Sequence, residues 1–209
     1  MVNQLPGTRE RLIHAALHLF AAKGYGSTSI ADVLHEAGVN SGSLYYFFPG
    51  KQDLLLAVLE EYRTGIEPML IAPAWEGVAD PLERIFALLA RYRHALVASE
   101  CTYGCPIGSL ALELHEPDPP VRAALAANFA AWTHAIEGCL AAADTALPKG
   151  TDRRALAEFV LTTMEGAVMQ SRTQRDIGFF DRSVSQLRTH FALLLNARRQ
   201  TRRTSRRKS

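Results

Sequence analysis

Apolar residues return with the period of an α-helix along almost the whole of this 209-residue chain, and this pattern constrains the fold more than any other feature. Spacings of three and four residues place side chains on one face of a helix. The first such face holds Leu12, Ile13, Ala16, Leu17 and Phe20. No segment alternates apolar and polar residues as a half-buried strand does. The sequence therefore predicts an all-α protein with about nine helices.

Capping residues and helix breakers set the predicted helix ends. Thr8 is expected to cap the first helix and Gly24 to end it. Asp80 and Pro81 begin the helix that follows the Pro- and Gly-interrupted stretch 65–78. The other helices are predicted at about 29–37, 41–47, from 51, 106–114, from 119, 152–171 and 181–196.

Charge divides the chain into three parts. Residues 1–51 have a net charge of +1, residues 52–196 of −6 and residues 197–209 of +7. Three electrostatic regimes suggest three roles, so we predict a head, a body and a basic tail with these bounds. The tail is expected to be disordered because residues 198–209 contain no apolar side chain. It would either attract phosphates or only aid solubility.

The chain contains an odd number of cysteines, Cys101, Cys105 and Cys139, which does not suggest a disulfide scaffold. The N-terminal residues lack the apolar centre of a signal peptide, and no apolar run approaches the roughly 20 residues that span a bilayer. We therefore expect a protein of the reducing cytoplasm with no membrane partner.

Three short predicted helices lie near the N-terminus, and Gly38 separates the second from the third. This spacing is typical of a helix-turn-helix, expected here at residues 29–48, in which a tight turn lets the later helix enter a major groove about 12 Å wide. Double-stranded DNA is therefore the expected partner of residues 1–51.

The residues of the predicted recognition helix suit that task. Its first turn, residues 41–43, is small and polar, so that phosphates and base edges can approach the backbone. Tyr45 and Tyr46 offer hydroxyls, and Lys51 an ammonium, at a reach suited to phosphate. The start of the second helix adds the hydroxyls of residues 27–29. The residues expected to anchor the recognition helix in the core are Leu44, Phe47 and Phe48.

Residues 8–62 resemble the DNA-binding region of TetR/AcrR-type transcriptional regulators. The resemblance is carried by Phe20 to Tyr25, the Ser/Thr start of the second helix, Ala37-Gly38-Val39, Leu44-Tyr45 and Phe48-Pro49-x-Lys51. It implies a homodimer that represses transcription from a palindromic operator and is released by a small molecule bound in the body. It places the DNA contacts on Ser27, Thr28, Ser29, Ser41, Gly42, Ser43, Tyr45, Tyr46 and Lys51.

Ser41 departs from the family's pattern, because many relatives carry a longer and often basic side chain there. A bidentate base contact from this helix is therefore not expected, and the operator sequence is not predicted.

The body is expected to hold the effector site and the dimer interface. A mostly apolar effector would lie between helices, against Phe86, Leu89, Tyr92, Cys105, Leu110, Phe129, Trp132 and Met164. The resemblance implies that the last two helices pair with those of a second copy through Leu156, Phe159, Val160, Gly166, Ala167, Val184, Leu187, Phe191 and Leu194. For the effector-site residues and for the dimer-interface residues alike, the alternative is that they form the core of a single chain.

Cys101 and Cys105 are open to two interpretations. They are either thiols that respond to oxidants or electrophiles, or two small apolar residues of a turn. His94 and His115 lie nearby, but the spacing matches no zinc site, so no metal and no cofactor are expected. Residues 104–113 resemble the LmrA/YxaF-like branch of the same family and also the NemR-type electrophile sensors, which favours Cys105 as a residue that modifies the switch.

Two other functions stay open. An enzyme with a Cys/His pair is formally possible, but no nucleophile motif or phosphate loop supports it. The histidines available to it are His14, His18, His35, His94, His115, His134 and His190. An architectural DNA-binding protein would not need a body of roughly 145 residues.

Overall fold

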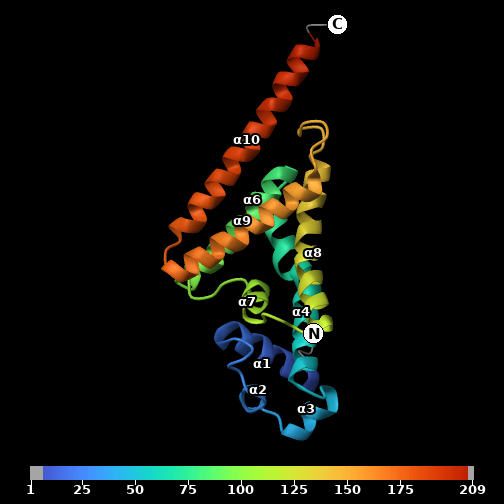
Figure 1. Ribbon diagram of the computed structural model, residues 1–209, viewed down its shortest axis with the longest axis vertical. Coiled ribbons are helices and arrows are strands. Elements are labelled where there is room, and N and C mark those ends of the chain that lie inside the picture. The colour runs from blue at the N-terminus through green and yellow to red at the C-terminus, as the bar shows by residue number, and fades with distance from the viewer. Residues whose placement is uncertain (1–6, 207–209) are drawn as a thin grey trace. The chain divides into compact units, whose positions relative to one another are not determined.

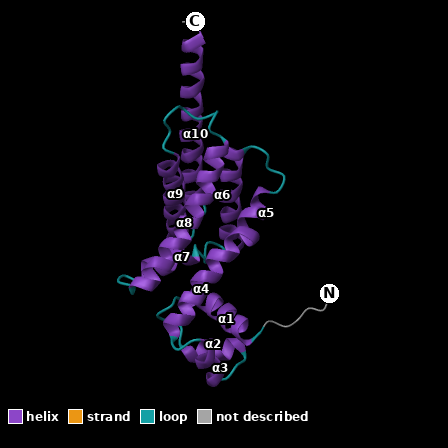
Figure 2. Cartoon of the chain, turned by 90° about the vertical axis from the view of Figure 1, so that its right-hand side faces the viewer, coloured by secondary structure: helices purple, strands orange, loops and turns teal. Residues whose placement is uncertain are grey.

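The computed structural model describes residues 7–206, and the side-chain surroundings of residues 7–200. Residues 7–206 contain ten α-helices, one π-helical turn and no strand (Figure 2). Nine of these α-helices have seven residues or more. The prediction of an all-α protein with about nine helices is therefore confirmed.

The chain divides into two compact units. Among the described residues, the first unit comprises 7–66 and 105–129, and the second comprises 67–104 and 130–206. Packing thus joins residues beyond position 51 to the N-terminal helices. The functional boundary between a head and a body at residue 51 stays a prediction.

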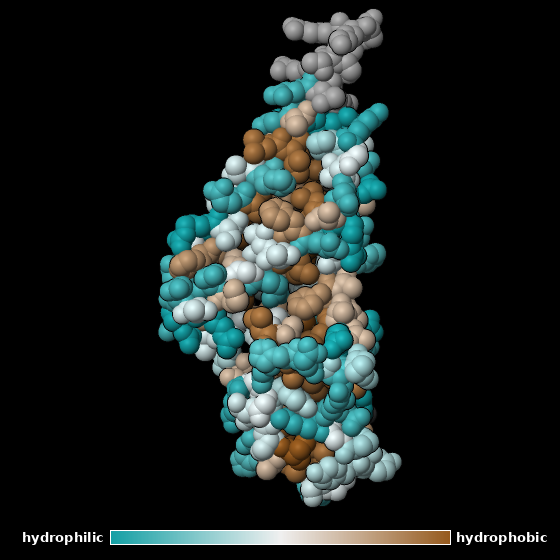
Figure 3. Space-filling view, viewed as in Figure 1, coloured by the Kyte–Doolittle hydropathy of each residue, from teal (hydrophilic) through white to brown (hydrophobic). Residues whose placement is uncertain are grey.

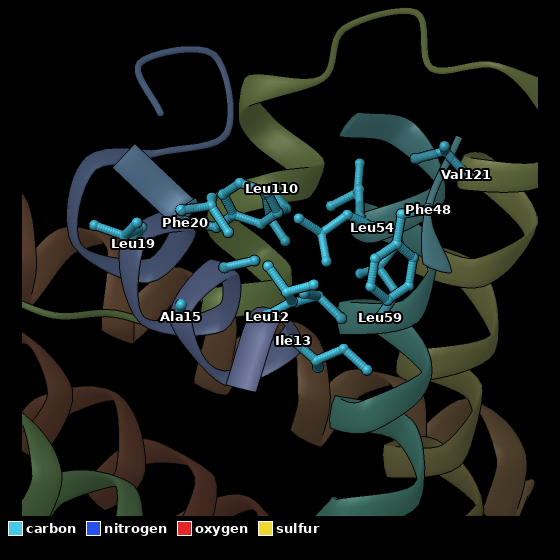
Figure 4. Packing of buried hydrophobic residues seen from close by; sticks show 14 of the residues in the cluster. Leu12, Ile13, Ala15, Leu19, Phe20, Phe48, Leu54, Leu59, Leu110 and Val121 are labelled. Atoms are coloured by element: carbon cyan, nitrogen blue, oxygen red, sulfur yellow. The ribbon is translucent and has the colours of Figure 1, made fainter. Parts of the chain in front are cut away.

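The first unit contains α1 (Thr8–Lys23), α2 (Ile30–Ala37), α3 (Ser41–Phe47), α4 (Lys51–Ile66), α7 (Pro106–Glu113) and the first part of α8 (Pro119–Ala142) (Figure 1). Apolar side chains of α1, α4 and α7 meet in its core, where Leu12, Leu54 and Leu110 are each at most 2 % exposed (Figure 4). α1 therefore packs on α7, although the two helices are almost 100 residues apart in the chain.

Glycines enclose α1. Gly7, and not Thr8, is its N-cap, because the Arg11 N–H already donates to the Gly7 carbonyl at 3.0 Å and Thr8 is the first helical residue. The predicted Thr8 cap is therefore wrong by one position. Gly24 ends the helix as predicted, with φ at 88°, a value that L-residues rarely adopt.

The second unit contains η1 (Glu67–Ile71), α5 (Ala72–Trp75), α6 (Pro81–Ala98), the second part of α8, α9 (Arg153–Gln174) and α10 (Gly178–Arg206). Asp80 caps α6 as predicted, because its carboxylate accepts the N–H groups of Leu82 and Glu83 at 2.7 and 3.1 Å. α10 packs against α9 and α6. The Arg188 guanidinium of α10 bonds Glu83 of α6 at 3.0 and 3.1 Å.

The stretch 65–78 is more helical than its prolines suggest. Pro68 lacks the N–H that would continue the hydrogen bonds of α4, and the chain changes there to the wider π turn η1. Pro73 lies in the first turn of α5, where a missing N–H costs little.

The C-terminal helix is longer than predicted. α10 runs to Arg206, whereas the sequence predicted its end near Asn196 and disorder from Ala197. Arginine, alanine and glutamine are good helix formers, and residues 197–206 contain no Gly or Pro to stop a helix that is already nucleated. The prediction of disorder is therefore wrong for residues 197–206, and residues 207–209 lie outside the described residues.

Candidate nucleic-acid interface

α2 and α3 are joined by a turn of three residues. Gly38, the C-cap of α2, adopts φ 62° and ψ 41°, the left-handed region that favours glycine. Asn40 caps α3, because its side-chain oxygen accepts the Ser43 N–H at 2.9 Å. These two signals make the turn short, and the helices have the bounds expected of a helix-turn-helix at residues 29–48.

The first turn of α3 leaves small groups open to solvent. Ser41 and Gly42 are exposed, and Ser43 is half-buried with its hydroxyl donating to the Asn40 side chain at 3.1 Å. The backbone at residues 41 and 42 can therefore be approached closely.

The aromatic residues of α3 separate into anchors and exposed rings. Leu44 and Phe48 are 0 and 4 % exposed and fix the helix in the core. Tyr45 and Tyr46 are 57 and 82 % exposed. Phe47 was predicted as an anchor but is 37 % exposed and packs edge-on against Tyr46, because it lies beside the buried stripe and not on it. Figure 3 shows brown and pale side chains over the α3 end of this unit.

The three hydroxyl residues at the start of α2 differ in exposure. Ser27 and Ser29 are exposed, and Ser29 caps α2 through a reciprocal pair with Asp32. Thr28 is 1 % exposed, and its hydroxyl donates to the Gly24 carbonyl at 2.7 Å. The predicted side-chain contact of Thr28 with DNA is corrected on this ground, because its hydroxyl stabilises the turn from inside.

Asp32 is a half-buried acid in the first turn of α2. The backbone N–H and the hydroxyl of Ser29 both donate to its carboxylate at 2.8 Å, which lowers the pKa of Asp32 below its ordinary value. The Ser29 donors thus favour the ionised form of the carboxylate in the folded protein.

Lys51, predicted to meet a phosphate, lies against the turn between α1 and α2. Its amine donates to the Tyr25 carbonyl and lies over the Tyr25 ring. Burial lowers the pKa of Lys51, and the nearby Glu113 carboxylate opposes that shift. Burial is also the main cause that raises the pKa of Tyr25. The ammonium thus has a protein partner, and its contact with DNA stays a prediction.

Glu113, at the end of α7, is a residue near the interface that the sequence analysis missed as a functional candidate. Its carboxylate accepts the backbone N–H groups of Tyr25 and Gly26. No sequence signal marks this contact, because Gly26 and Glu113 are 87 positions apart.

The residues predicted to line the effector site belong to both units. In the first unit, Cys105 and Leu110 are buried in the core and Phe129 packs against it. In the second unit, the rings of Tyr92 and Trp132 lie 5.2 Å apart. The remaining members, each at most 5 % exposed, are Phe86, Leu89 and Met164. Their role as an effector site stays a prediction.

None of the three cysteines forms a disulfide, and all three are buried. Cys105 is the N-cap of α7, and its sulfur accepts the Gly108 N–H at 3.5 Å. Burial raises the pKa of Cys139 to about 11. Cys101 follows Glu100, and both adopt positive φ values of 55° and 50°, a strained backbone for residues with side chains.

The residues predicted for the dimer interface differ in exposure. Those buried within the chain are Leu156, Val160, Ala167, Leu187 and Phe191. Gly166, Val184 and Leu194 are half-buried, and Phe159 is 47 % exposed. Two further apolar residues of the same helices, Met169 and Leu193, are 44 and 64 % exposed.

Within the part of the chain that the structure describes, no group of three or more His, Cys, Asp or Glu side chains is arranged to hold a metal ion. Among residues 7–206, no helix combines the length and the apolar content that crossing a bilayer requires.

Two family profiles match the chain. The profile of bacterial regulatory proteins of the tetR family matches residues 12–58, which include α2 and α3. The profile of the C-terminal domain of LmrA/YxaF-like transcriptional regulators matches residues 81–186, from the start of α6 into α10. Both profiles describe regulators of transcription.

Individual proteins show the same similarity. An uncharacterised helix-turn-helix-type transcriptional regulator of Mycobacterium tuberculosis is 33 % identical over 189 residues, which cover 88 % of this chain and 94 % of the relative. The regulator LmrA of Bacillus subtilis is 34 % identical over 131 residues, or 62 % of this chain and 69 % of LmrA. The crystal structure of a regulatory protein TetR from Rhodobacter sphaeroides is 26 % identical, with a TM-score of 0.79 over 88 % of this chain and 98 % of that one.

Proposed function

Because this chain belongs to the TetR family of bacterial transcriptional regulators, we propose that it is a ligand-responsive repressor that a small, mostly apolar molecule or a thiol modification releases from a palindromic operator. Residues 1–51 act as the DNA-binding head, residues 52–196 bind the effector and the second copy, and the basic residues 197–209 add attraction to phosphates. Membership of a family of transcriptional regulators sets the enzyme alternative aside.

The observation that carries the DNA-binding role is the exposed face of α3 above its buried anchors. Leu44 and Phe48 fix the helix, so Tyr45 and Tyr46 present their hydroxyls from a rigid element. Such hydroxyls bind phosphates and set the position of a helix on the duplex without reading its sequence. The other donors of the proposed interface are Ser27, Ser29, Ser41, Ser43 and the backbone at Gly42. Lys51 joins them only if its amine leaves Tyr25.

A homodimer would place two α3 helices in successive major grooves, about 34–36 Å apart. The support for a second copy is the exposed apolar set on α9 and α10, namely Phe159, Met169 and Leu193. An effector acts by binding one spacing of the two heads more tightly than the other, since only differential affinity shifts such an equilibrium.

The DNA-binding role is tested by footprinting on the DNA upstream of the protein's own gene, followed by fluorescence anisotropy with the protected duplex. Tyr46→Phe removes one hydroxyl and keeps the ring, so we expect binding to weaken roughly tenfold, the value of one charge-assisted hydrogen bond. Tyr103→Phe, at a tyrosine 51 % exposed in the second unit, is the matched control and should bind like the wild type. Wild-type binding by a Tyr45→Phe/Tyr46→Phe protein would exclude the two tyrosine hydroxyls as phosphate contacts.

The sensing role is tested on the same protein–DNA complex. Small apolar compounds are screened for loss of anisotropy, and release that reverses on dialysis supports the repressor. Binding that no compound reverses favours an architectural protein instead. Cys105→Ser tests the thiol route: if neither the DNA affinity nor its response to electrophiles changes, that route is excluded.

A further inference from the structure

A carboxylate from α7 binds the turn between α1 and α2. The Tyr25 N–H donates to one oxygen of Glu113 at 2.9 Å, and the Gly26 N–H donates to the other at 2.6 Å. Two parallel bonds to one carboxylate fix the orientation of the acceptor as well as its distance. Two successive peptide units are therefore held in one geometry by a single side chain.

The glycines beside Tyr25 leave room for this carboxylate. A Cβ at Gly24 would lie 2.9 Å from one oxygen of Glu113, and a Cβ at Gly26 would lie 3.0 Å from the other. Gly24 also has a left-handed φ, but Gly26 does not. A side chain at position 26 would therefore require the Glu113 carboxylate to shift by a few tenths of an ångström, whereas the backbone conformation there imposes no such limit.

The opposite side of the same turn is bound by α4. Lys51 takes the Tyr25 carbonyl, while Glu113 takes the Tyr25 N–H. Side chains of α4 and α7 therefore bind both the backbone N–H and the backbone carbonyl of Tyr25. The turn leads directly into Ser27 and Ser29, the exposed hydroxyls at the start of α2.

We propose that Glu113 is a positioning residue for DNA binding, through which α7 sets the affinity of the head for phosphates. The proposal rests on the DNA interface proposed above. With Glu113 in place, the start of α2 is ordered before DNA arrives. When α7 shifts, the turn is released, and DNA binding must meet the entropy of ordering it again. The other end of α7 is capped by the buried Cys105, so a change there can reach the turn through eight residues of helix.

A purely electrostatic account predicts that removing the charge of Glu113 strengthens DNA binding, whereas the positioning role predicts that it weakens binding. Glu113 is an acid in a unit that binds a polyanion, so neutralising it would strengthen DNA binding if it had no positioning role. Glu113→Gln therefore separates the two accounts by the sign of the change. Glu116→Gln is the matched control, because Glu116 is an exposed acid three residues later whose partner is Arg122 at 3.3 Å.

The first measurement is binding to the footprinted upstream duplex by anisotropy. We expect Glu113→Gln to weaken DNA binding about fivefold, because a charged carboxylate that accepts two hydrogen bonds becomes a neutral amide with one accepting oxygen. Glu116→Gln should bind DNA as tightly as the wild type or more tightly. Binding by Glu113→Gln that matches or exceeds that of Glu116→Gln overturns the proposal. Cooperative unfolding with a thermal midpoint well above the assay temperature, in both variants and the wild type, excludes a folding defect.

The second measurement needs no DNA. Exchange of the Tyr25 and Gly26 amide protons, followed by NMR, should become about tenfold faster in Glu113→Gln and stay unchanged in Glu116→Gln. Unchanged exchange in Glu113→Gln overturns the contact itself. Faster exchange with unchanged DNA affinity overturns the positioning role alone. A wild-type protein that binds no duplex but shows the expected exchange overturns the proposed function, and the role in DNA binding with it.

A double-mutant cycle isolates the pair. Gly26→Ala should weaken DNA binding in the wild-type background, because its Cβ would lie 3.0 Å from a Glu113 oxygen and the carboxylate would have to shift. In a Glu113→Ala background the same change should have little further effect, since the two residues act through one contact. Equal effects of Gly26→Ala in both backgrounds contradict the proposal.

Discussion

Lys51 and Tyr25 meet through one nitrogen atom: the amine donates to the backbone carbonyl at 2.5 Å and lies 4.2 Å from the centroid of the aromatic ring. A lysine with this pair of contacts stabilises the fold before any DNA is bound. Residues from α4 and from the α1–α2 turn are thereby joined.

Lys51→Met should accordingly lower the free energy of unfolding by about 1 kcal/mol, the usual value of one such hydrogen bond. Lys23→Met, at an exposed lysine of the same unit, removes the same charge and should leave stability unchanged. Urea denaturation measures both. If Lys51→Met keeps full stability and only lowers the slope of log affinity against log salt by about one unit, the amine contacts a phosphate and does not stabilise the turn.

Ser29→Ala should destabilise the protein by about 1 kcal/mol, because it removes the cap of α2. The loss should depend on pH. The pKa of Asp32 lies below its ordinary value in the folded state, so its stabilising effect is complete above the unfolded pKa and is lost as the pH falls through the folded one. The gap in urea midpoint between wild type and Ser29→Ala should therefore be wide above the ordinary pKa of an aspartate and should narrow as the pH falls through the lowered pKa of Asp32. A gap of constant width would exclude the Asp32 carboxylate from the cap.

Replacement of Phe159 or Leu193 by Glu should shift the protein from dimer to monomer at micromolar concentration. Both side chains are exposed on helices proposed to face a second copy, where a charge would be desolvated without a partner. Val97→Glu is the control, since Val97 is 47 % exposed but belongs to α6. Sedimentation velocity measures the outcome. A stable monomer in the wild-type protein would overturn the dimer itself.

Cys139 should resist alkylation in the folded protein. With a pKa of about 11, its thiolate fraction near about pH 8 is roughly 10⁻³, so iodoacetamide should react at least about 100-fold more slowly than with a free cysteine. The rate should rise about tenfold per pH unit until the thiol titrates. Mass spectrometry of the alkylated peptide follows it. Rapid labelling at neutral pH would show that the helix end around Cys139 opens.

Removal of residues 197–209 should flatten the salt dependence of DNA binding and leave the sequence preference unchanged. The segment carries a net charge of +7, and each phosphate it neutralises adds nearly one unit to the slope of log affinity against log salt. Anisotropy titrations across salt concentrations compare the full and truncated chains. An unchanged slope would assign these residues to solubility alone.

Local signals in the sequence predicted much of the fold. Asp80 with Pro81, Gly24, and the break before Lys51 each act within a few residues, so their positions could be read directly. The capping role of Asn40 is local too, and a polar residue before a small helix could have suggested it. The end of α10 was missed because lack of apolar residues was taken as lack of helix, although helix propagation needs only favourable backbone propensity.

Contacts between distant residues could not be predicted in the same way. Thr28 sits in a hydroxyl-rich run that resembles a DNA-binding edge, and only the packed turn shows that it points inward. Phe47 lies one position from the buried Phe48, and a period of 3.6 residues does not decide between neighbours at the edge of a face. Glu113 has an exposed side chain, and nothing in its own surroundings along the chain connects it with Tyr25.

Gly38 is required between α2 and α3 for its left-handed backbone conformation and not for its small size. A Cβ built there meets no atom within 4 Å, so the surroundings leave room for a methyl group. The obstacle is the positive φ of 62°, which costs an L-residue about 1 kcal/mol or more and costs its mirror image nothing. A D-alanine placed at this position by chemical ligation would therefore keep the junction and would also restrict the unfolded chain. The angle between α2 and α3 thus depends on the one residue of the turn that has no chirality.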